Sequence, residues 1–378
     1  MVQRTPPMGW NTWNTFGENI SEKLIFETAD AMAESGLRDA GYQYLVIDDC
    51  WSKKQRDSEG CLEPDPEKFP HGMKAVSDYV HSRGLKFGMY SCAGTLTCAG
   101  YPGSFEHEFV DAATFAEWGV DFLKYDYCYK PDYENGRLLY TRMGLALANS
   151  GRDILFNACS WGADQTAEWI GCTGAHSWRS TGDINDGWES IRRLSDLQLS
   201  LQPYGGINCF NDMDMLVVGM GGKGNVGFTG CTEEEYRVHF SIWALRNSPL
   251  FVGCDVRDMS DATRRTLLNR EVIAINQDPA CRQPFLVSRR SDSSAIWAKL
   301  LDNGDIAIGA FNMEDQEAGA WCSLSLPLAS LGLNRSCGKT LVLRDLWTGE
   351  ESTVRDDVEL LAVPAHGCRL FRARIVDR

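Results

Sequence analysis

Histidine is scarce in this chain of 378 residues, and its six histidines, at 71, 81, 107, 176, 239 and 366, are scattered. They form neither an HxH nor an HExxH motif, and the 14 cysteines form no CxxC pair, so the usual zinc-ligand spacings are missing. A glycine-rich phosphate loop between a strand and a helix is missing as well. We therefore expect no metal, no cofactor and no phosphate chemistry.

Long apolar runs are also missing, since none reaches the roughly 18 residues that a membrane-spanning helix needs. Residues 1–7 lack the apolar core of a signal peptide, which favours a cytoplasmic protein, or a secreted one if the chain is a mature form. Lysine and arginine number 37 against 52 acidic residues, giving a net charge of -15. Such a surface repels nucleic acids and anionic membranes, so we expect neither as a partner. A neutral substrate fits better, and a homo-oligomer is compatible with the sequence.

What the chain does contain is a repeated alternation of short apolar segments with helical patterns. Eight such units predict an α/β fold, a (β/α)₈ TIM barrel over residues 1–283, with its active site at the C-terminal ends of the strands. From residue 284 the pattern changes to short alternating segments separated by turns. This predicts a C-terminal antiparallel β-sandwich domain over residues 284–378.

The segment 120–128 carries the most suggestive chemistry. Its middle is apolar enough for a buried strand, and Lys124 and Asp126 stand two residues apart, so both side chains face the same way. An ammonium beside a carboxylate keeps that carboxylate ionised, as a nucleophile must be. An ordinary ion pair at a strand end explains the same two residues equally well, and the segment alone does not decide between these readings.

Several segments together resemble the glycoside hydrolase family of α-galactosidases and α-N-acetylgalactosaminidases, family 27. The resemblance lies in the order and spacing of eight short motifs, at 5–13, 47–51, 69–73, 101–104, 123–128, 177–184, 211–216 and 276–279. The region from 284 onward resembles the family's C-terminal domain in size and pattern only.

The resemblance implies a retaining exo-glycosidase with two carboxyl groups in distinct roles. Asp126 would attack the anomeric carbon to form a glycosyl ester, and Asp183 would act as the acid and then the base. Retention needs these carboxyls roughly 5 Å apart across the sugar. Taken alone, Asp183 would be read as a cap or turn residue before Ile184.

The resemblance also implies a set of sugar-binding residues. Asp48 and Asp49 would accept hydrogen bonds from O4 and O6, although adjacent residues of a regular strand face apart, so one must twist into the pocket. Arg179 would bond the substituent at C2, and Asp214 would be a supporting acid. The remaining implied contacts are an apolar platform, two residues that hold hydroxyls near the nucleophile, and a rim cysteine: Trp13, Lys124, Tyr90 and Cys98.

Two disulfides are implied in the same way, Cys98–Cys128 and Cys159–Cys172, and both would pin loops at the rim of the active site. Cys50 occupies a family position, but the usual partner region near Glu18 has no cysteine. Either Cys61 is its partner or Cys50 is free.

The segment after Cys159 bears on which sugar is bound. Family α-galactosidases usually carry a glutamate after this cysteine, where Ser160 stands, and members acting on N-acetylgalactosamine carry a serine there and an alanine three residues on, as Ala163 is. A serine leaves room for an acetamido group. We therefore expect removal of terminal α-linked N-acetylgalactosamine from glycans. An α-galactosidase or a β-L-arabinopyranosidase is the alternative, and a carbohydrate-binding protein on an inactive barrel is a further one.

Overall fold

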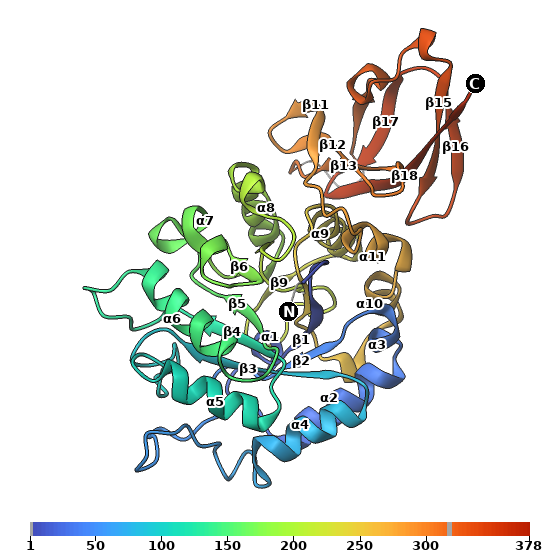
Figure 1. Ribbon diagram of the computed structural model, residues 1–378. Helices are drawn as coiled ribbons and strands as arrows, with labels where there is room; N and C mark the ends of the chain where they lie inside the picture. The colour runs from blue at the N-terminus through green and yellow to red at the C-terminus, as the bar shows by residue number, and fades with distance from the viewer. Residues whose placement is uncertain (1–2, 316–319) are drawn as a thin grey trace. The chain divides into compact units, whose positions relative to one another are not determined.

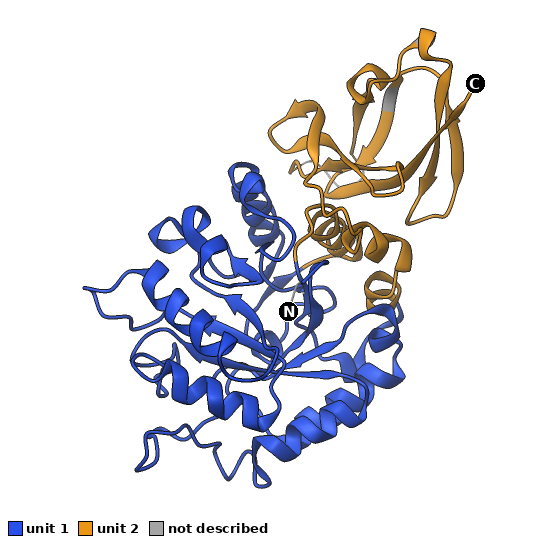
Figure 2. Cartoon of the chain, viewed as in Figure 1, with its two compact units in different colours: residues 1–230, 249–261 blue, residues 231–248, 262–378 orange. Residues whose placement is uncertain are grey.

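The computed structural model describes residues 3–315 and 320–378, which form two compact units. Residues 1–230 with 249–261 make the first unit, and residues 231–248 with 262–378 make the second (Figure 2). The second unit therefore contains three helices in addition to the C-terminal sheets. The boundary at residues 283/284 stays a prediction.

The first unit contains a parallel barrel, which confirms the predicted fold class. Its strands follow the order β10-β1-β2-β3-β4-β5-β6-β8, and a bridge between Leu216 and Val252 closes the ring. The strands are β1 (Met8–Asn11), β2 (Tyr44–Val46), β3 (Lys86–Cys92), β4 (Phe122–Asp126), β5 (Leu155–Ala158), β6 (Ser177–Arg179), β8 (Phe210–Asp212) and β10 (Leu250–Val252). Most of their residues are buried, as expected for parallel strands that are covered on both faces.

Helices follow most of these strands and surround them in the first unit (Figure 1). Two of the longer ones begin with side-chain caps: Ser21 accepts from the N–H of Leu24, and Asn135 from that of Leu138. The helices of this unit are α1 (Trp13–Phe16), α2 (Glu22–Glu34), α3 (Leu37–Ala40), α4 (Gly72–Ser82), α5 (Glu108–Trp118), α6 (Gly136–Ala148), α7 (Thr166–Trp169) and α8 (Trp188–Leu197). Single 3₁₀ turns are η1 (Ala163–Gln165), η2 (Ile170–Cys172), η3 (Gln198–Ser200), η4 (Gln202–Tyr204) and η5 (Val256–Asp258).

A small parallel sheet stands apart from the barrel strands. It pairs β7 (Asp186–Gly187) with β9 (Gly227–Gly230), in the loops that follow β6 and β8. Because loops after barrel strands lie at the active-site face, this sheet belongs to the rim of the barrel.

The second unit contains the predicted sandwich and the helices α9 (Glu233–Leu245), α10 (from Asp261 to Leu267) and α11 (Arg270–Asn276). The larger antiparallel sheet has the order β11 (Phe285–Ser291), β12 (Ser294–Leu300), β13 (Ile306–Asn312), β18 (Gly367–Asp377), β15 (Lys339–Asp345) and β16 (Glu351–Val354). The smaller pairs β14 (Trp321–Leu326) with β17 (Val358–Pro364), and η6 (Leu328–Leu331) and η7 (Arg335–Cys337) connect strands. Apolar side chains of both sheets share one core. Within residues 3–315 and 320–378, no helix is long and apolar enough to cross a membrane.

Candidate active site

A cavity at the C-terminal ends of the barrel strands gathers most of the residues predicted from the sequence. Those that line it are Trp13, Asp48, Asp49, Tyr90, Cys98, Lys124, Asp126, Arg179, Asp183 and Asp214. The lining also includes residues that the sequence did not single out: Asn14, Trp161, Ile184, Met215 and Val226. Ser160 and Ala163 do not line this cavity. The cavity thus brings together side chains as far apart in the chain as Trp13 and Val226 because parallel strands end at one face.

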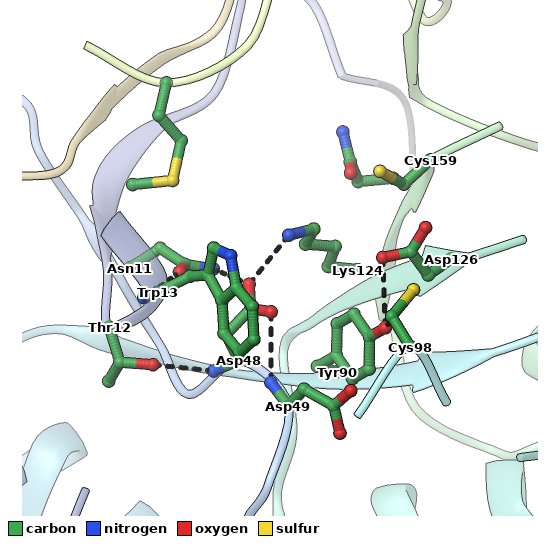
Figure 3. A network of polar contacts seen from close by, with 12 residues as sticks. Asn11, Thr12, Trp13, Asp48, Asp49, Tyr90, Cys98, Lys124, Asp126 and Cys159 are labelled. Carbon is green, nitrogen blue, oxygen red and sulfur yellow. Dashed lines mark hydrogen bonds and ion pairs between the residues drawn. The ribbon is translucent and has the colours of Figure 1, made fainter. Parts of the chain in front are cut away.

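Asp48 and Asp49 both reach the cavity because the chain leaves the regular strand after Val46 (Figure 3). Asp48 Oδ2 accepts hydrogen bonds from Asn11 Nδ2 at 2.7 Å and from Lys124 Nζ at 2.8 Å. Asp49 accepts from the backbone N–H of Ala99 at 2.9 Å. Burial raises the pKa of Asp49 even though the hydrogen bonds that this carboxylate accepts favour its charged form.

Asp126 ends strand β4 and is only 6% exposed. Its Oδ2 accepts from the Tyr90 hydroxyl at 3.0 Å (Figure 3). Its Oδ1 accepts from the backbone N–H of Tyr127 at 3.0 Å. Burial raises the pKa of Asp126 to about 6, although Lys124 and the two hydrogen bonds act in the opposite direction. This carboxyl is therefore ionised at neutral pH and lies in a fixed orientation.

Lys124 differs in one respect from the sequence interpretation, which paired it with Asp126. Its ammonium hydrogen-bonds Asp48 from the neighbouring wall, and within the described residues no direct bond to Asp126 is found. Although burial alone would lower it, the pKa of Lys124 is raised by Asp48 first and by other neighbours including Asp126. Its charge still lowers the pKa of Asp126, but it acts at a distance and is outweighed by burial.

Arg179, at the end of β6, joins two carboxylates of the opposite wall. Its guanidinium contacts Asp183 Oδ1 at 2.8 Å and Asp214 Oδ1 at 3.0 Å. The Asp183 side chain is 73% exposed, whereas Asp214 is buried. Burial raises the pKa of Asp214 to about 6, and the charge of Arg179 outweighs burial at Asp183 and lowers its pKa. Arg179 thus contacts one exposed acid, Asp183, and one buried acid, Asp214.

Comparison with known proteins agrees with this geometry. A family model described as alpha galactosidase A matches residues 5–278, and a model described as the alpha galactosidase C-terminal beta sandwich domain matches residues 291–373. The chain belongs to glycoside hydrolase family 27.

The family 27 relatives are similar over nearly the whole chain. An alpha-galactosidase of Cyamopsis tetragonoloba is 44% identical over 97% of this chain and 86% of its own length. Alpha-galactosidase 2 of Arabidopsis thaliana is 45% identical over 97% of this chain and 89% of its own length. The Saccharomyces cerevisiae alpha-galactosidase solved with raffinose has a TM-score of 0.86 at 30% identity, covering 99% of this chain and 98% of that one. The chain is thus a glycoside hydrolase.

Within this family 27 site, the loop after β5 departs most from the sequence interpretation. Ser160 is fully buried, and its hydroxyl lies 2.6 Å from the Thr166 hydroxyl, which itself donates to the carbonyl of Ala163. Since a threonine hydroxyl has one hydrogen, Ser160 must donate to Thr166. Its side chain is therefore engaged inside the loop.

Trp161 takes the place in the cavity that the sequence gave to its neighbours. Its φ of +57° is unusual for a bulky residue, and Gly162 follows with φ +80°. A Cβ at Gly162 would lie 2.4 Å from the carbonyl oxygen of Ser180, so only glycine fits there. No periodic pattern could have revealed this left-handed turn.

Of the two predicted disulfides, the structure contains Cys98–Cys128, which ties the rim loop to the segment directly after Asp126. The predicted Cys159–Cys172 bridge is absent: both are free, because Cys159 is buried near Arg179 while Cys172 is exposed and donates to the Trp169 carbonyl. Cys50 and Cys61 are free as well.

A group of potential metal ligands also lies here. Within residues 3–315 and 320–378, Cys98, Cys128 and Asp126 offer ligand atoms within 4.8 Å of one another. Joined in a disulfide, the two sulfurs are not thiolates, and the thiolate is the form that binds metals. The donor set therefore does not fit a metal while the bridge is intact.

Proposed function

We propose that this protein is a retaining exo-α-galactosidase, which removes terminal α-linked galactose through a covalent glycosyl-aspartate intermediate. The observation that carries the proposal is a single cavity lined by two acids of opposite character, the buried Asp126 and the open Asp183. Retaining glycosidases use such a pair of carboxyl groups, one as the nucleophile and the other as the acid and then the base.

In the first step, the Asp126 carboxylate attacks the anomeric carbon while the bond to the leaving oxygen breaks. Asp183 gives its proton to that oxygen, and a galactosyl ester of Asp126 forms. The hydrogen bonds from Tyr90 and Tyr127 fix the attacking carboxylate in position. Because its pKa of about 6 lies below neutral, the carboxyl is ionised, and therefore nucleophilic, at neutral pH.

In the second step, Asp183 takes a proton from a water molecule whose oxygen attacks the anomeric carbon. The ester bond breaks, Asp126 is regenerated as a carboxylate, and galactose leaves with its original configuration. The exposure of Asp183 supports this role because both the leaving oxygen and the incoming water must reach it. Arg179 lowers the pKa of Asp183, which favours the carboxylate needed as the base in this step and disfavours the protonated form needed in the first step.

Sugar binding would use the rest of the cavity. Asp48, Asp49 and Lys124 offer charged partners for hydroxyl groups, and Trp13 offers an apolar face for the ring. The terminal nitrogens of Arg179 already contact both neighbouring acids, Cys159 and the Thr181 carbonyl, whereas its buried Nε–H has no hydrogen-bond partner among the described residues.

Galactose is favoured over N-acetylgalactosamine by two observations. The similar curated relatives reported above are named alpha-galactosidases. In addition, Ser160 and Ala163 do not line the cavity, whereas the large indole of Trp161 does, which removes the argument that small residues leave room for an acetamido group.

The test compares nitrophenyl α-galactoside, α-N-acetylgalactosaminide and β-L-arabinopyranoside on the same enzyme. We expect the highest kcat/KM on the α-galactoside, and NMR of the first product should show the α-anomer. A preference for the N-acetylgalactosaminide would restore the interpretation drawn from Ser160 and Ala163. Release of the β-anomer first would contradict the covalent mechanism.

A further inference from the structure

A wide groove adjoins the cavity, and its lining residues take no part in the reaction described above. The volume of the groove is about 680 Å³, compared with about 80 Å³ for the cavity. The volume of the groove lies in the usual range of ligand-binding clefts. Its walls come from Asn185, from helix α8 and from strand β9. These elements all belong to the first unit.

Two neighbouring strands lead from the cavity into this groove. Asp183 and Ile184 line the cavity, while Asn185, directly after them, lines the groove. Likewise Val226 lines the cavity and Phe228, two residues on, lines the groove. Strands β7 and β9 pair side by side, so the groove begins on the side of the cavity that carries Asp183.

Phe228 presents an aromatic face in the groove and is 67% exposed. Its ring lies against Gly187, where an added Cβ would approach the ring to 3.1 Å. Because it lines a groove, this exposed aromatic face is available to stack against a ring of a bound ligand.

The strand that carries Phe228 is fixed by backbone contacts. The Val226 N–H donates to the carbonyl of Asn14 at 3.0 Å, and the Val226 carbonyl accepts from the Asp186 N–H at 3.0 Å. Asp186 also accepts from the N–H of Gly222 at 2.6 Å. The aromatic platform is therefore positioned before any ligand arrives, which lowers the entropy cost of binding.

The rim of the groove is polar. Glu189, Arg193 and Asp196 line it from α8, and Asn185 lines it from the segment after Asp183. Amide, carboxylate and guanidinium groups around one aromatic ring suit a saccharide, whose hydroxyls bond the polar groups while its C–H face covers the ring. A lipid chain would need a continuous apolar track, and only Leu197 adds a large aliphatic side chain here.

We propose that this groove binds the leaving-group saccharide of an oligosaccharide α-galactoside, with Phe228 stacked against one of its sugar rings. The proposal rests on the proposed function, because the acid Asp183 must touch the oxygen that joins galactose to this leaving group. Whatever is attached to that oxygen extends from the Asp183 side of the cavity, and the groove begins there.

The test measures kcat/KM of Phe228→Ala on raffinose, whose leaving group is a disaccharide, and on α-galactosyl fluoride, whose leaving group is one atom. We expect a loss of about tenfold on raffinose and no change on the fluoride. Phe228→Trp should retain activity on raffinose because it keeps an aromatic face. The matched control is Phe109→Ala, which removes another exposed phenylalanine (58%, against 67% for Phe228) from helix α5.

Each other outcome overturns one of the two proposals. Equal losses on both substrates, or no loss on raffinose, would overturn the groove proposal alone, because the unaltered enzyme would still cleave α-galactosides. A change in oligomeric state with Phe228→Ala at unchanged raffinose kinetics would assign the groove to contacts between copies of the chain instead. If the unaltered enzyme cleaves neither substrate, the proposed function fails and the groove proposal fails with it.

Discussion

The two walls of the cavity place their acids in opposite environments. On the wall formed by β2 and β4, Asp126 is almost completely buried, and burial raises its pKa to about 6. On the wall formed by β6 and the following loop, Asp183 is 73% exposed, and Arg179 lowers its pKa. The nearest cation of the first wall hydrogen-bonds a different acid, Asp48, while the cation of the second wall contacts Asp183 directly.

This difference suits a division of labour between the two acids. A nucleophile needs a fixed direction and little competing water, which a buried strand end supplies. An acid that must exchange protons with a leaving group and with water needs access, which a loop residue at the mouth supplies. The difference also predicts that the two acids respond differently to substitution, to pH and to the leaving group.

The largest effect is expected from Asp126→Asn, which removes the attacking carboxylate without changing its size. The kcat/KM should fall by at least about 10⁴-fold on every α-galactoside, whatever its leaving group. Asp132→Asn, on the exposed loop after β4, is the control and should retain full activity. Near-normal turnover by Asp126→Asn would remove this residue from the mechanism.

A stability measurement distinguishes chemistry from misfolding in the same variant. The folded pKa of Asp126, about 6, lies above the unfolded value of 3.8, so its burial destabilises the folded state increasingly as pH rises from about 4 to 6. Asp126→Asn should therefore unfold at a temperature a few degrees higher than the unaltered enzyme at pH 7.5, and at an unchanged temperature near pH 3.5. A lower melting temperature at pH 7.5 would contradict the burial argument.

Asp183→Asn should have the second-largest effect, and one that depends on the leaving group. With raffinose, kcat/KM should fall by roughly 10²–10⁴-fold, whereas α-galactosyl fluoride, which needs no proton, should lose far less. For the unaltered enzyme, the fall in kcat/KM on the alkaline side should appear with raffinose and be absent with the fluoride. Equal losses on both substrates would mean that Asp183 does not protonate the leaving group.

Lys124→Met tests the weaker influence of the cation on the buried wall. Since Lys124 lowers the pKa of Asp126, its removal should move the acid limb of the kcat/KM profile on α-galactosyl fluoride, which needs no proton from Asp183, from about 6 upward by about one unit. Asp48 also loses its ion pair, so stability should fall by about 3 kcal/mol or more. Lys130→Met, whose ammonium bonds the Glu134 carbonyl and lies over the ring of Tyr127, should leave the profile in place.

The smallest effect is expected from Ser160→Ala. Because the Ser160 hydroxyl is bonded to Thr166 and does not line the cavity, the preference between α-galactoside and α-N-acetylgalactosaminide should stay within about twofold. Stability should fall by about 1 kcal/mol through the lost hydrogen bond. Trp161→Ala is the paired variant and should shift this preference toward the larger sugar. If Ser160→Ala alone shifted the preference between these two sugars, Ser160 would have to contact the substrate.

Much of the overall architecture could be predicted from the sequence pattern. Short apolar segments ending in polar residues, such as the one ending at Asp126, predict parallel strands whose C-terminal ends share one face. The sequence pattern singled out Lys124 and Asp126 at one strand end, whereas the resemblance to the family implied that Asp48 and Arg179 belong to the same site. The antiparallel sheets of the second unit followed from alternation of apolar and polar residues, which reports a one-sided core.

Other features depend on geometry that no periodic pattern records. The partner of Lys124 depends on where the chain places Asp48 after it leaves β2 at Val46, which the strand pattern does not give. The position of Trp161 depends on a left-handed backbone path, and the pairing of β7 with β9 involves strands too short to show alternation. The Cys159–Cys172 prediction was wrong because family spacing says nothing about which way each sulfur faces.

The turn at Gly162 has a consequence for how this site could change over time. Any side chain there would collide with the Ser180 carbonyl and displace the segment that carries the neighbouring indole. A position that does not itself line the cavity therefore controls where the Trp161 indole lies in it. Evolution toward bulkier sugars along this route would have to begin with a shift of main chain, and only afterwards refine the contacting side chains.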